Sequence, residues 1–387
     1  MPTQAMEDIV EDIAKAVVGA EETLKIGAVR SWRVVLRRKT VWKTARYTKG
    51  DIDALVVGIS DPDGLTGYGC LPAMFLEGES APSAEALLNV VLRPVITGRE
   101  HAGIQPLMNE LELSLRHNHQ LKFAIEEALL DLQAKKLNTP LFNLLGGLCF
   151  AEMPVMRALT LKSPEDTAKD AVGYKEKGYT HMKLKVGLDP KRDVAALKAV
   201  REAMGEDVFL SIDANRSYTP MQAIRVINQM EKWGLDLAEQ PIKADDVRGM
   251  AFIRSHVQTP IMADEGVRTP AEAARLIEAG AIDAVAIKLW NVGGFFKGKE
   301  IAAVCNANNC LCHIATTPGS QIMEAGQLHF AASTPNMFGG CELAEFAALL
   351  EDPGSGLEIV NGTLKVPMGA GLGINIDLSQ GVETTPK

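Results

Sequence analysis

Three features are missing from this 387-residue sequence, and each absence excludes a class of protein. No stretch of about 18 or more uncharged apolar residues occurs, which argues against a membrane protein. No basic stripe occurs, and the formal net charge of −9 argues against non-specific binding to nucleic acid. The six cysteines form no paired framework and no secretory signal precedes them, so we expect reduced thiols in a cytoplasmic protein.

The pattern that most resembles a metal-binding cysteine motif is Cys310-x-Cys312-His313. These residues lie in an apolar run, and no second pair of cysteines or histidines follows at zinc-finger spacing. We therefore interpret the pattern as a buried strand rather than a zinc site.

Changes in sequence texture predict an extension followed by two domains. Residues 1–24 are acidic and helix-prone, and they precede the predicted fold. From residue 25, β-rich segments lead to an Asp-Gly turn within residues 61–64, and residues 83–146 then show helical periodicity. Strands followed by helices predict an α+β domain over residues 25–150. The tail, residues 357–387, returns to β texture, and we expect it to pack back onto that first domain.

Residues 151–356 alternate short apolar runs with amphipathic helices such as 195–203, 221–233 and 271–278. Eight such alternations predict an α/β fold, a barrel of parallel strands. The predicted strands are Val155–Leu161, His181–Val186, Val208–Asp213, Leu235–Glu239, Ile261–Asp264, Ile282–Leu289, Leu311–Thr316 and Cys341–Phe346.

The second of these predicted strands contains Lys183 and Lys185. Because side chains alternate between faces along a strand, both ammonium groups lie on the same face. Inside a closed sheet the two like charges would lower each other's pKa, as a lysine requires to act as a base near neutral pH. Taken alone, the pair favours an exposed edge strand with two solvated lysines. The residues that end the following strands reverse that interpretation.

Charged residues end the next four predicted strands, one β/α unit apart: Asp213, Glu239, Asp264 and Lys288. With Lys185 they should share the C-terminal rim of the barrel, where the active sites of such folds are built. Three carboxylates on neighbouring strands form a hard-oxygen site suited to Mg²⁺. Each carboxylate taken singly fits a helix cap equally well. Three in succession, flanked by lysines, favour the metal site.

Five motifs occur in order along the second domain: Lys-Leu-Lys at 183–185, Asp-Ala-Asn-Arg at 213–216, Glu-Gln-Pro at 239–241, Ala-Asp-Glu at 263–265 and Lys-Leu-x-x-x-Gly-Gly at 288–294. The set resembles the enolase superfamily, with greatest similarity to its muconate-lactonising-enzyme subgroup in the mandelate racemase/muconate lactonizing enzyme family. The resemblance covers nearly everything from residue 25 onward. It implies an α+β capping domain over a modified TIM barrel, (β/α)7β, and a homo-oligomer, either a dimer or an octamer.

The resemblance also implies roles for individual residues. The three carboxylates bind Mg²⁺, and Lys185 and Lys288 are the acid/base groups. The family removes a proton α to a carboxylate, and Mg²⁺ stabilises the resulting enediolate. Because strands two and six are opposed across a barrel, the two lysines would face opposite sides of the substrate carbon. Lys183 would depress the pKa of Lys185 or contact the substrate carboxylate.

The candidate substrate-binding residues are Asn215, Glu265, Trp290 and Glu324. Asn215 either orients ligands or closes a loop. Trp290 shares the strand face of Lys288. Its indole either forms the bottom of the pocket, stacks on a cationic substrate or packs in the core. Glu324 resembles an acidic position that meets substrate in relatives, but the helix dipole equally favours a glutamate in a first turn.

Three positions depart from the family pattern. Cys70 stands where the family usually shows glutamate, so that capping-domain contact is not carried over. Residues 342–345, Glu-Leu-Ala-Glu, are not the Asp-x-Asp of the dipeptide epimerases, which disfavours a dipeptide substrate. His313 lies inside the strand-seven run and lacks the aspartate partner of the mandelate-racemase type, which predicts a core histidine.

Three functions remain compatible with the sequence. The first is a racemase or epimerase that performs 1,1-proton transfer on a small carboxylate such as an amino-acid derivative. The second is a cycloisomerase or dehydratase that uses the same intermediate, with one lysine acting only electrostatically. The third is a binding protein that has lost catalysis, and the intact set of carboxylates and lysines speaks against it. The presence of both lysines favours the first.

Overall fold

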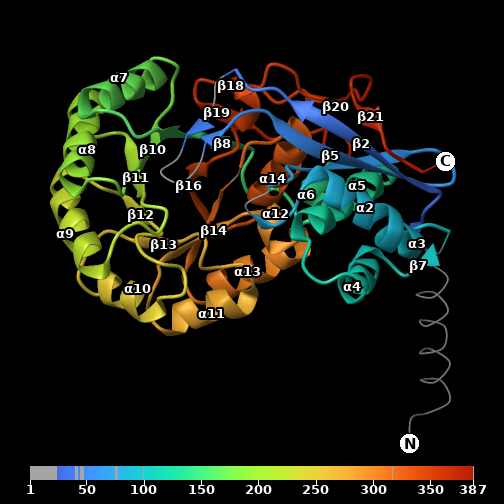
Figure 1. Ribbon diagram of the computed structural model, residues 1–387, viewed down its shortest axis with the longest axis horizontal. Coiled ribbons are helices and arrows are strands. Elements are labelled where there is room, and N and C mark those ends of the chain that lie inside the picture. The colour runs from blue at the N-terminus through green and yellow to red at the C-terminus, as the bar shows by residue number, and fades with distance from the viewer. Residues whose placement is uncertain are drawn as a thin grey trace, which may run out of the picture.

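The computed structural model describes residues 24–39, 42–43, 48–74, 77–98, 100–315 and 317–386. A barrel ringed by helices lies beside a capping domain built on an antiparallel sheet (Figure 1). The predicted helix-prone extension lies outside the described residues, apart from Leu24 in the short strand β1 (Leu24–Lys25).

Eight parallel strands among the described residues form one sheet, in which neighbours in sequence are neighbours in space. A parallel bridge between Val155 and Cys341 joins the two ends of this sheet and closes the barrel. The fold is a modified TIM barrel with a capping domain, as predicted. The strands are β9 (Met156–Leu159), β10 (His181–Lys185), β11 (Phe209–Asp213), β12 (Leu237–Glu239), β13 (Ile261–Ala263), β14 (Ala284–Ile287), β15 (Leu311–Ile314) and β16 (Met337–Cys341).

The connections between these strands contain α7 (Pro164–Lys175), α8 (Pro190–Met204), α9 (Pro220–Met230), α10 (Val247–Arg254), α11 (Pro270–Glu278), α12 (Leu289–Val292), α13 (Phe295–Ala307) and α14 (Gln321–Ala332). Four of them begin with the same local signal. The side chains of Ser163, Asp189, Thr219 and Thr269 each accept a backbone N–H of the first turn, and a proline follows each of these residues. Both features satisfy or remove the unpaired donors of a helix start, so the sequence itself sets where these helices begin.

The first seven predicted barrel strands agree with β9–β15 to within two residues at each end. The eighth prediction, Cys341–Phe346, is wrong: the strand is β16, which overlaps it only at Cys341. The run Met-Phe-Gly-Gly-Cys contains Gly339 and Gly340, both at positive φ, and glycine has little strand propensity. A Cβ at Gly340 would lie 2.7 Å from the carbonyl oxygen of Pro154, so close approach of the chain requires glycine here.

The capping domain contains a four-stranded antiparallel sheet in the order β21-β2-β5-β6. Its strands are β2 (Ala28–Leu36), β5 (Ile52–Ser60), β6 (Thr66–Leu71) and β21 (Val382–Glu383). The turn between β5 and β6 closes as predicted, because the Gly64 N–H donates to the Asp61 carbonyl. Strand β21 brings the C-terminal segment back to β2, while the exact domain boundaries stay a prediction.

Helix α5 (His119–Lys136) packs directly on β6. A Cβ at Gly67 would lie 2.1 Å from the Ala128 carbonyl oxygen, and one at Gly69 would lie 2.0 Å from that of Ala124. The helix is buried on nearly all sides, so the amphipathic pattern predicted for it understates its burial. Around it lie α2 (Ala81–Leu87), η2 (Leu88–Leu92), α3 (Arg93–Ile96), α4 (Ile104–Ser114) and α6 (Leu141–Leu144).

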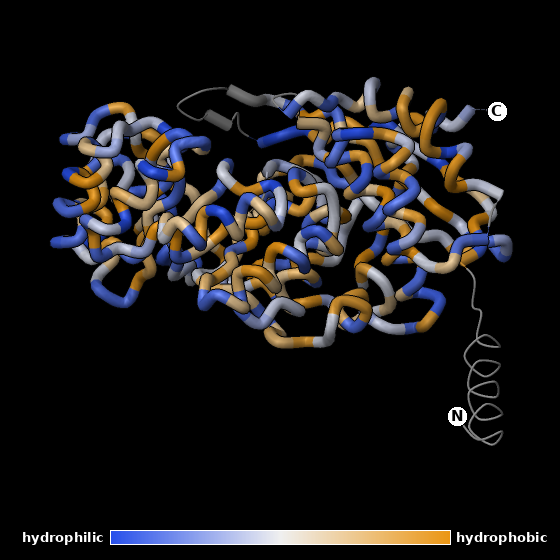
Figure 2. Tube along the Cα trace, turned by 90° about the horizontal axis from the view of Figure 1, so that it is seen from below, coloured by the Kyte–Doolittle hydropathy of each residue, from blue (hydrophilic) through white to orange (hydrophobic). Residues whose placement is uncertain are grey.

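Short strands complete the architecture: β3 (Trp42–Lys43), β4 (Thr48–Lys49), β7 (Glu100–His101), β8 (Glu152–Pro154), β17 (Gly354–Ser355), β18 (Ile359–Val360), β19 (Thr363–Lys365) and β20 (Asn375–Ile376). Apolar and hydrophilic positions are interleaved throughout both parts of the molecule (Figure 2). None of the helices in the described ranges combines the length and apolar character that a membrane crossing requires.

Candidate active site

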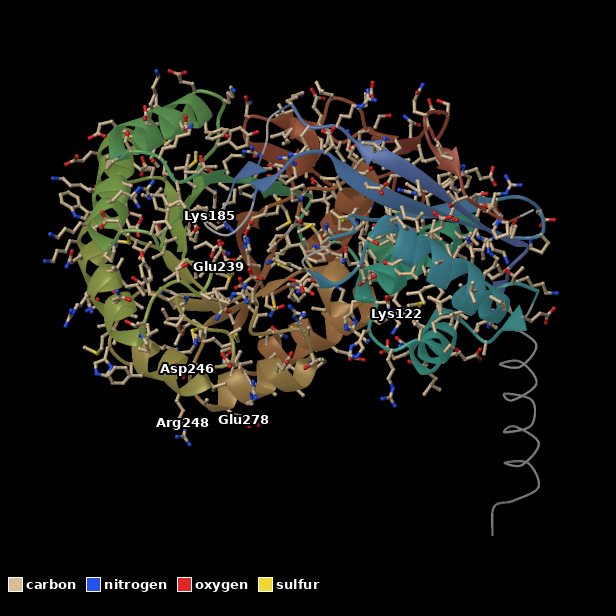
Figure 3. All side chains as sticks on the ribbon, in the orientation of Figure 1. Lys122, Lys185, Glu239, Asp246, Arg248 and Glu278 are labelled. Carbon is tan, nitrogen blue, oxygen red and sulfur yellow. The ribbon has the colours of Figure 1, made fainter. Side chains whose placement is uncertain are left out.

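Lys183 and Lys185 lie on the same face of β10, as strand alternation predicts. In the strand register Lys185 is level with Asp213 of β11, and Asp213 is level with Glu239 of β12. Lys185 and Glu239 both lie within the curve of the outer helices (Figure 3). Three neighbouring strands therefore bring functional groups to one level of the barrel.

Lys183 is buried in a cage of carboxylates. Its Nζ lies 2.6 Å from Glu342 Oε1, 3.0 Å from Glu239 Oε2 and 3.9 Å from Asp213 Oδ2. Burial alone would lower the pKa of Lys183, but Glu239, Glu342 and Asp213 outweigh it and hold the pKa well above its ordinary value. The predicted lowering of the Lys183 pKa by its lysine neighbour is therefore wrong, because the sequence spacing of the two lysines did not reveal the carboxylates facing them.

Lys185 donates to Asp213 Oδ2 and lies 3.4 Å from Asn215 Oδ1. Asn215 in turn donates to Asp213 twice, from its backbone N–H at 2.8 Å and from its side-chain amide at 3.1 Å. Asn215 has a φ of 41°, a left-handed conformation that costs free energy outside glycine. The strained residue thus holds both Asp213 oxygens in place.

Asp264, directly after β13, and Lys288, directly after β14, form a similar pair, with 2.5 Å between Lys288 Nζ and Asp264 Oδ2. Gln240, at a φ of 34°, accepts the backbone N–H of Asp264 at 2.9 Å and that of Gly266 at 3.2 Å. Gln240 therefore ties the end of β12 to the end of β13. In the sequence, Gln240 was noted only as the middle residue of Glu-Gln-Pro. Its positive φ, which is visible only in the structure, identifies it as a positioning residue.

The three predicted metal ligands are each bonded to a lysine: Asp213 to Lys185, Glu239 to Lys183 and Asp264 to Lys288. Across the part of the chain that the structure describes, no three acidic, histidine or cysteine side chains lie close enough to share one metal ion. The donors nevertheless suit a hard cation, since all are carboxylates. Burial and then the neighbouring Asp213 raise the Glu239 pKa well above its ordinary value, because both disfavour a second negative charge here.

The predicted substrate-binding residues differ in their surroundings. Glu265 lies 3.0 Å from the Arg216 Nε, and burial followed by Asp264 raises its pKa to about 7. The indole of Trp290 is buried, and its Nε1 has no hydrogen-bond partner among the described residues. Glu324 is fully buried and accepts the backbone N–H groups of residues 345 and 346. Glu324 lies in the first turn of α14, as the helix-dipole interpretation expected, and it also supports the chain after β16.

Glu342 is the functional candidate that sequence reasoning missed. Its Oε1 accepts hydrogen bonds from Lys183 at 2.6 Å and from His313 at 3.0 Å. Burial would raise the Glu342 pKa, but Lys183 and His313 outweigh burial and hold the pKa far below its ordinary value. His313 is a fully buried core residue, as predicted, yet it also completes a chain of contacts with Lys183. No spacing rule connects these positions.

Two sequence interpretations concern cysteines. Cys310 and Cys312 are buried, and Cys312 lies in β15, which confirms the interpretation as a buried strand. The Cys70 side chain is likewise fully buried, in the hydrophobic core that the capping sheet shares with the barrel, and its backbone N–H donates to Glu127 Oε2 at 2.9 Å. Position 70 therefore contributes packing.

Comparison with known proteins agrees with this geometry. The family described as "Enolase C-terminal domain-like" matches residues 166–380, and "Mandelate racemase / muconate lactonizing enzyme, N-terminal domain" matches residues 28–146. L-Ala-D/L-Glu epimerase of Bacillus subtilis is 30% identical over 91% of this chain and 97% of its own length. Muconate cycloisomerase 1 of Rhodococcus opacus is 30% identical over 84% of this chain and 88% of its own.

Solved structures show the same architecture. The substrate-liganded epimerase from Bacillus subtilis superposes with a TM-score of 0.86 at 30% identity, over 91% of this chain and 99% of that one. The dipeptide epimerase of Enterococcus faecalis, complexed with Mg and L-Leu-L-Tyr, also gives 0.86, at 29% identity over 91% of this chain and 100% of that one. The chain therefore belongs to the mandelate racemase/muconate lactonizing enzyme family of the enolase superfamily, and it is an isomerase of the racemase, epimerase or cycloisomerase kind.

Proposed function

We propose that this enzyme performs a Mg²⁺-dependent 1,1-proton transfer on a small carboxylate, as a racemase or epimerase. The observation that carries the proposal is the placement of Lys185 and Lys288. Lys185 ends β10 and Lys288 follows β14, four strands further along the closed eight-stranded sheet. Strands four apart in such a barrel face each other, so a substrate carbon between them has one lysine on each side.

The remaining groups fit this reaction. Asp213, Glu239 and Asp264 would hold the metal, and Mg²⁺, when bound, supplies charge that stabilises an enediolate. Lys185 is paired with Asp213 and Lys288 with Asp264, so each amine lies beside a residue that would hold the metal, where it could exchange a proton with the substrate carbon. Lys183 also pairs with Glu342, which is not one of the proposed metal ligands, so it is suited to be a fixed cation beside the substrate carboxylate rather than a base.

A cycloisomerase or a dehydratase is the second candidate. Muconate cycloisomerase 1 is as similar in sequence to this chain as the dipeptide epimerase of Bacillus subtilis is, at 30% identity. A cis-3-hydroxy-L-proline dehydratase from Roseibium aggregatum is also 30% identical, over 81% of the chain. Residues 342–345 lack the Asp-x-Asp pattern of dipeptide epimerases, so we expect a substrate other than a dipeptide. Assembly into a dimer or an octamer stays a prediction.

The test is hydrogen exchange at the α-carbon. A library of N-acyl amino acids and hydroxy acids is incubated with the enzyme and Mg²⁺ in D₂O, and each acid is followed by NMR. We expect loss of the α-proton signal with inversion of configuration for at least one compound. Exchange without inversion, followed by ring closure or loss of water, would instead favour the second candidate. No exchange of any acid by a folded, Mg²⁺-saturated enzyme would contradict both.

A further inference from the structure

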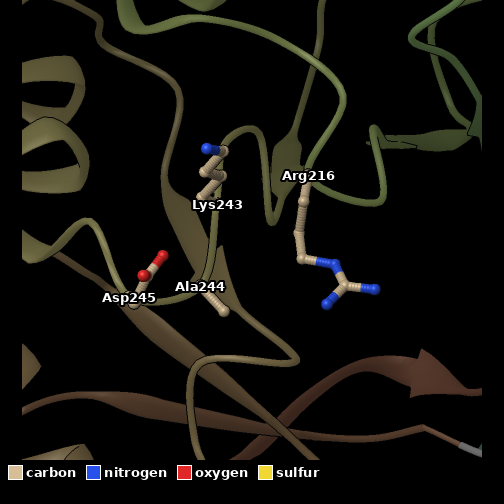
Figure 4. Close-up of a pocket in the computed structure, with 4 residues that line it drawn as sticks. All are labelled: Arg216, Lys243, Ala244 and Asp245. Carbon is tan, nitrogen blue, oxygen red and sulfur yellow. The ribbon is translucent and has the colours of Figure 1, made fainter.

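A pocket of about 360 Å³ lies beside the loops that follow β11 and β12 (Figure 4). Its lining residues are Arg216, Lys243, Ala244 and Asp245. Pockets that bind small ligands in proteins measure about 300–1,000 Å³, so this one has room for part of a small molecule. The mechanism proposed above uses none of these four residues.

The pocket is cationic, and its cations have unused bonding capacity. Arg216 has one ion pair among the described residues, from Nε to Glu265 at 3.0 Å, which leaves both terminal nitrogens of the guanidinium without a partner there. Lys243 is exposed and makes no side-chain hydrogen bond or ion pair within the described ranges. Asp245 is the one acidic residue in the lining. The lining therefore holds two cations and one carboxylate, and the Glu265 carboxyl group pairs with Arg216 from outside the lining.

The backbone holds Arg216 firmly next to the candidate active site. Its φ is 66°, and its N–H donates to the Gln240 carbonyl at 2.9 Å, which anchors the loop after β11 to the end of β12. The preceding residue, Asn215, lies 3.4 Å from Lys185 Nζ. Arg216 Nε pairs with Glu265, the residue that follows Asp264, so the guanidinium lies next to the neighbour of a candidate metal ligand.

We infer that this pocket binds a second acidic group of the substrate, which makes the substrate a dicarboxylate or an equally dianionic acid. The inference rests on the proposed function for the reacting end of the molecule. A planar guanidinium and a flexible ammonium are the two side chains best suited to bind a carboxylate. The same cations would also attract a free anion such as phosphate, so the experiment includes that source.

The test uses pairs of N-acyl amino acids. The two members of a pair differ by one negative charge, as N-acetylglutamate and N-acetylglutamine do. Binding is measured by calorimetry and α-hydrogen exchange by NMR, for the natural enzyme, Lys243→Gln, Arg216→Gln and Arg248→Gln. Arg248 points into solvent from α10 and is the matched control (Figure 3). We expect at least one diacid to bind more tightly than its amide partner. That preference should fall about threefold in Lys243→Gln, since the site is exposed, and about tenfold or more in Arg216→Gln.

Because binding and α-hydrogen exchange are measured separately, the test of the subsite can fail or succeed independently of the proposed function. A charge preference in binding that Lys243→Gln reduces and Arg248→Gln retains supports the subsite, even if no compound exchanges its α-hydrogen and the proposed function fails. Exchange with no charge preference in any pair overturns the subsite and leaves the proposed function standing. Inorganic phosphate that binds at Lys243 without displacing the diacid also overturns it, because the pocket would then be a separate anion site.

Discussion

Glu126 of the capping domain accepts a hydrogen bond from the backbone N–H of Phe296, in the first turn of the barrel helix α13, at 2.8 Å. The N-cap of that helix, Gly294, has no side chain to perform this role. A carboxylate from a different part of the chain therefore caps the helix and joins the two halves of the molecule. Burial raises the Glu126 pKa to about 8 in spite of this bond.

This shift predicts a pH-dependent stability. The folded-state pKa of Glu126 lies above its ordinary value of 4.5, so the folded protein binds a proton that the unfolded chain has released. The free energy of unfolding contributed by Glu126 should therefore fall as the pH rises from about 4.5 to about 8. Glu126→Gln should flatten the profile by about 2–4 kcal/mol over that window.

The measurement is urea unfolding of both proteins at pH 5.5, 7 and 8.5. Glu206→Gln, at an exposed glutamate, is the control and should leave the natural pH profile intact. Parallel pH profiles for the natural protein and Glu126→Gln would contradict the assignment.

Replacing Gly69 of β6 by alanine should greatly reduce stability. A Cβ at Gly69 would lie 2.0 Å from the carbonyl oxygen of Ala124 in α5, and neither the strand nor the helix backbone can yield cheaply. Gly69→Ala should therefore lower the free energy of unfolding by about 3 kcal/mol or more.

Gly173 in α7 is the matched control, because nothing lies within 4 Å of its added Cβ. There alanine should raise stability by about 0.5–1 kcal/mol, since it restricts the unfolded chain and favours the helix. Thermal and urea unfolding distinguish the two signs, and equal effects at both positions would refute the close packing of α5 on β6.

The barrel and its rim were predictable from sequence because the β/α repeat converts spacing into position. Asp213, Glu239 and Asp264 are each one repeat apart, so any closed barrel with these strands brings them to one rim. The register of β10 to β12 brings Lys185, Asp213 and Glu239 to one level. Their roles as metal ligands stay a prediction.

Contacts between strands distant in sequence were not predictable. Lys183 meets Glu342, which is 159 residues away, and Glu342 meets His313. These contacts reverse the expected sign of the Lys183 pKa shift. The last strand was missed for a local reason, since Gly339 and Gly340 are typical of turns but are required here by close packing against Pro154.

Removal of metal should abolish activity reversibly. Asp213→Asn, Glu239→Gln and Asp264→Asn should each weaken Mg²⁺ binding in a calorimetric titration, because each removes one negative oxygen donor. Asp207→Asn, at an exposed position, is the control and should bind Mg²⁺ normally. Full activity after exhaustive chelation would refute the metal site.

The two lysines decide between the mechanisms. In a two-base racemase Lys185 and Lys288 each handle a proton on one face of the carbon. Lys288→Ala should then greatly slow racemisation, yet Lys185 should still exchange the α-hydrogen of one enantiomer with D₂O. Lys185→Ala should show the mirror pattern with the other enantiomer. Each racemisation rate should fall about 10²–10⁴-fold, the usual contribution of a placed general acid or base.

A cycloisomerase or dehydratase predicts a different outcome. Exchange would then depend on one lysine only, and the other would act as a fixed charge that arginine partly replaces. Enantiomer-specific deuterium exchange in the two alanine variants, with Lys185→Arg and Lys288→Arg beside them, separates these cases. Because Lys185 is bonded to Asp213 and Lys288 to Asp264, each variant must also be titrated with Mg²⁺. Full turnover by both alanine variants would rule out acid–base roles for either residue.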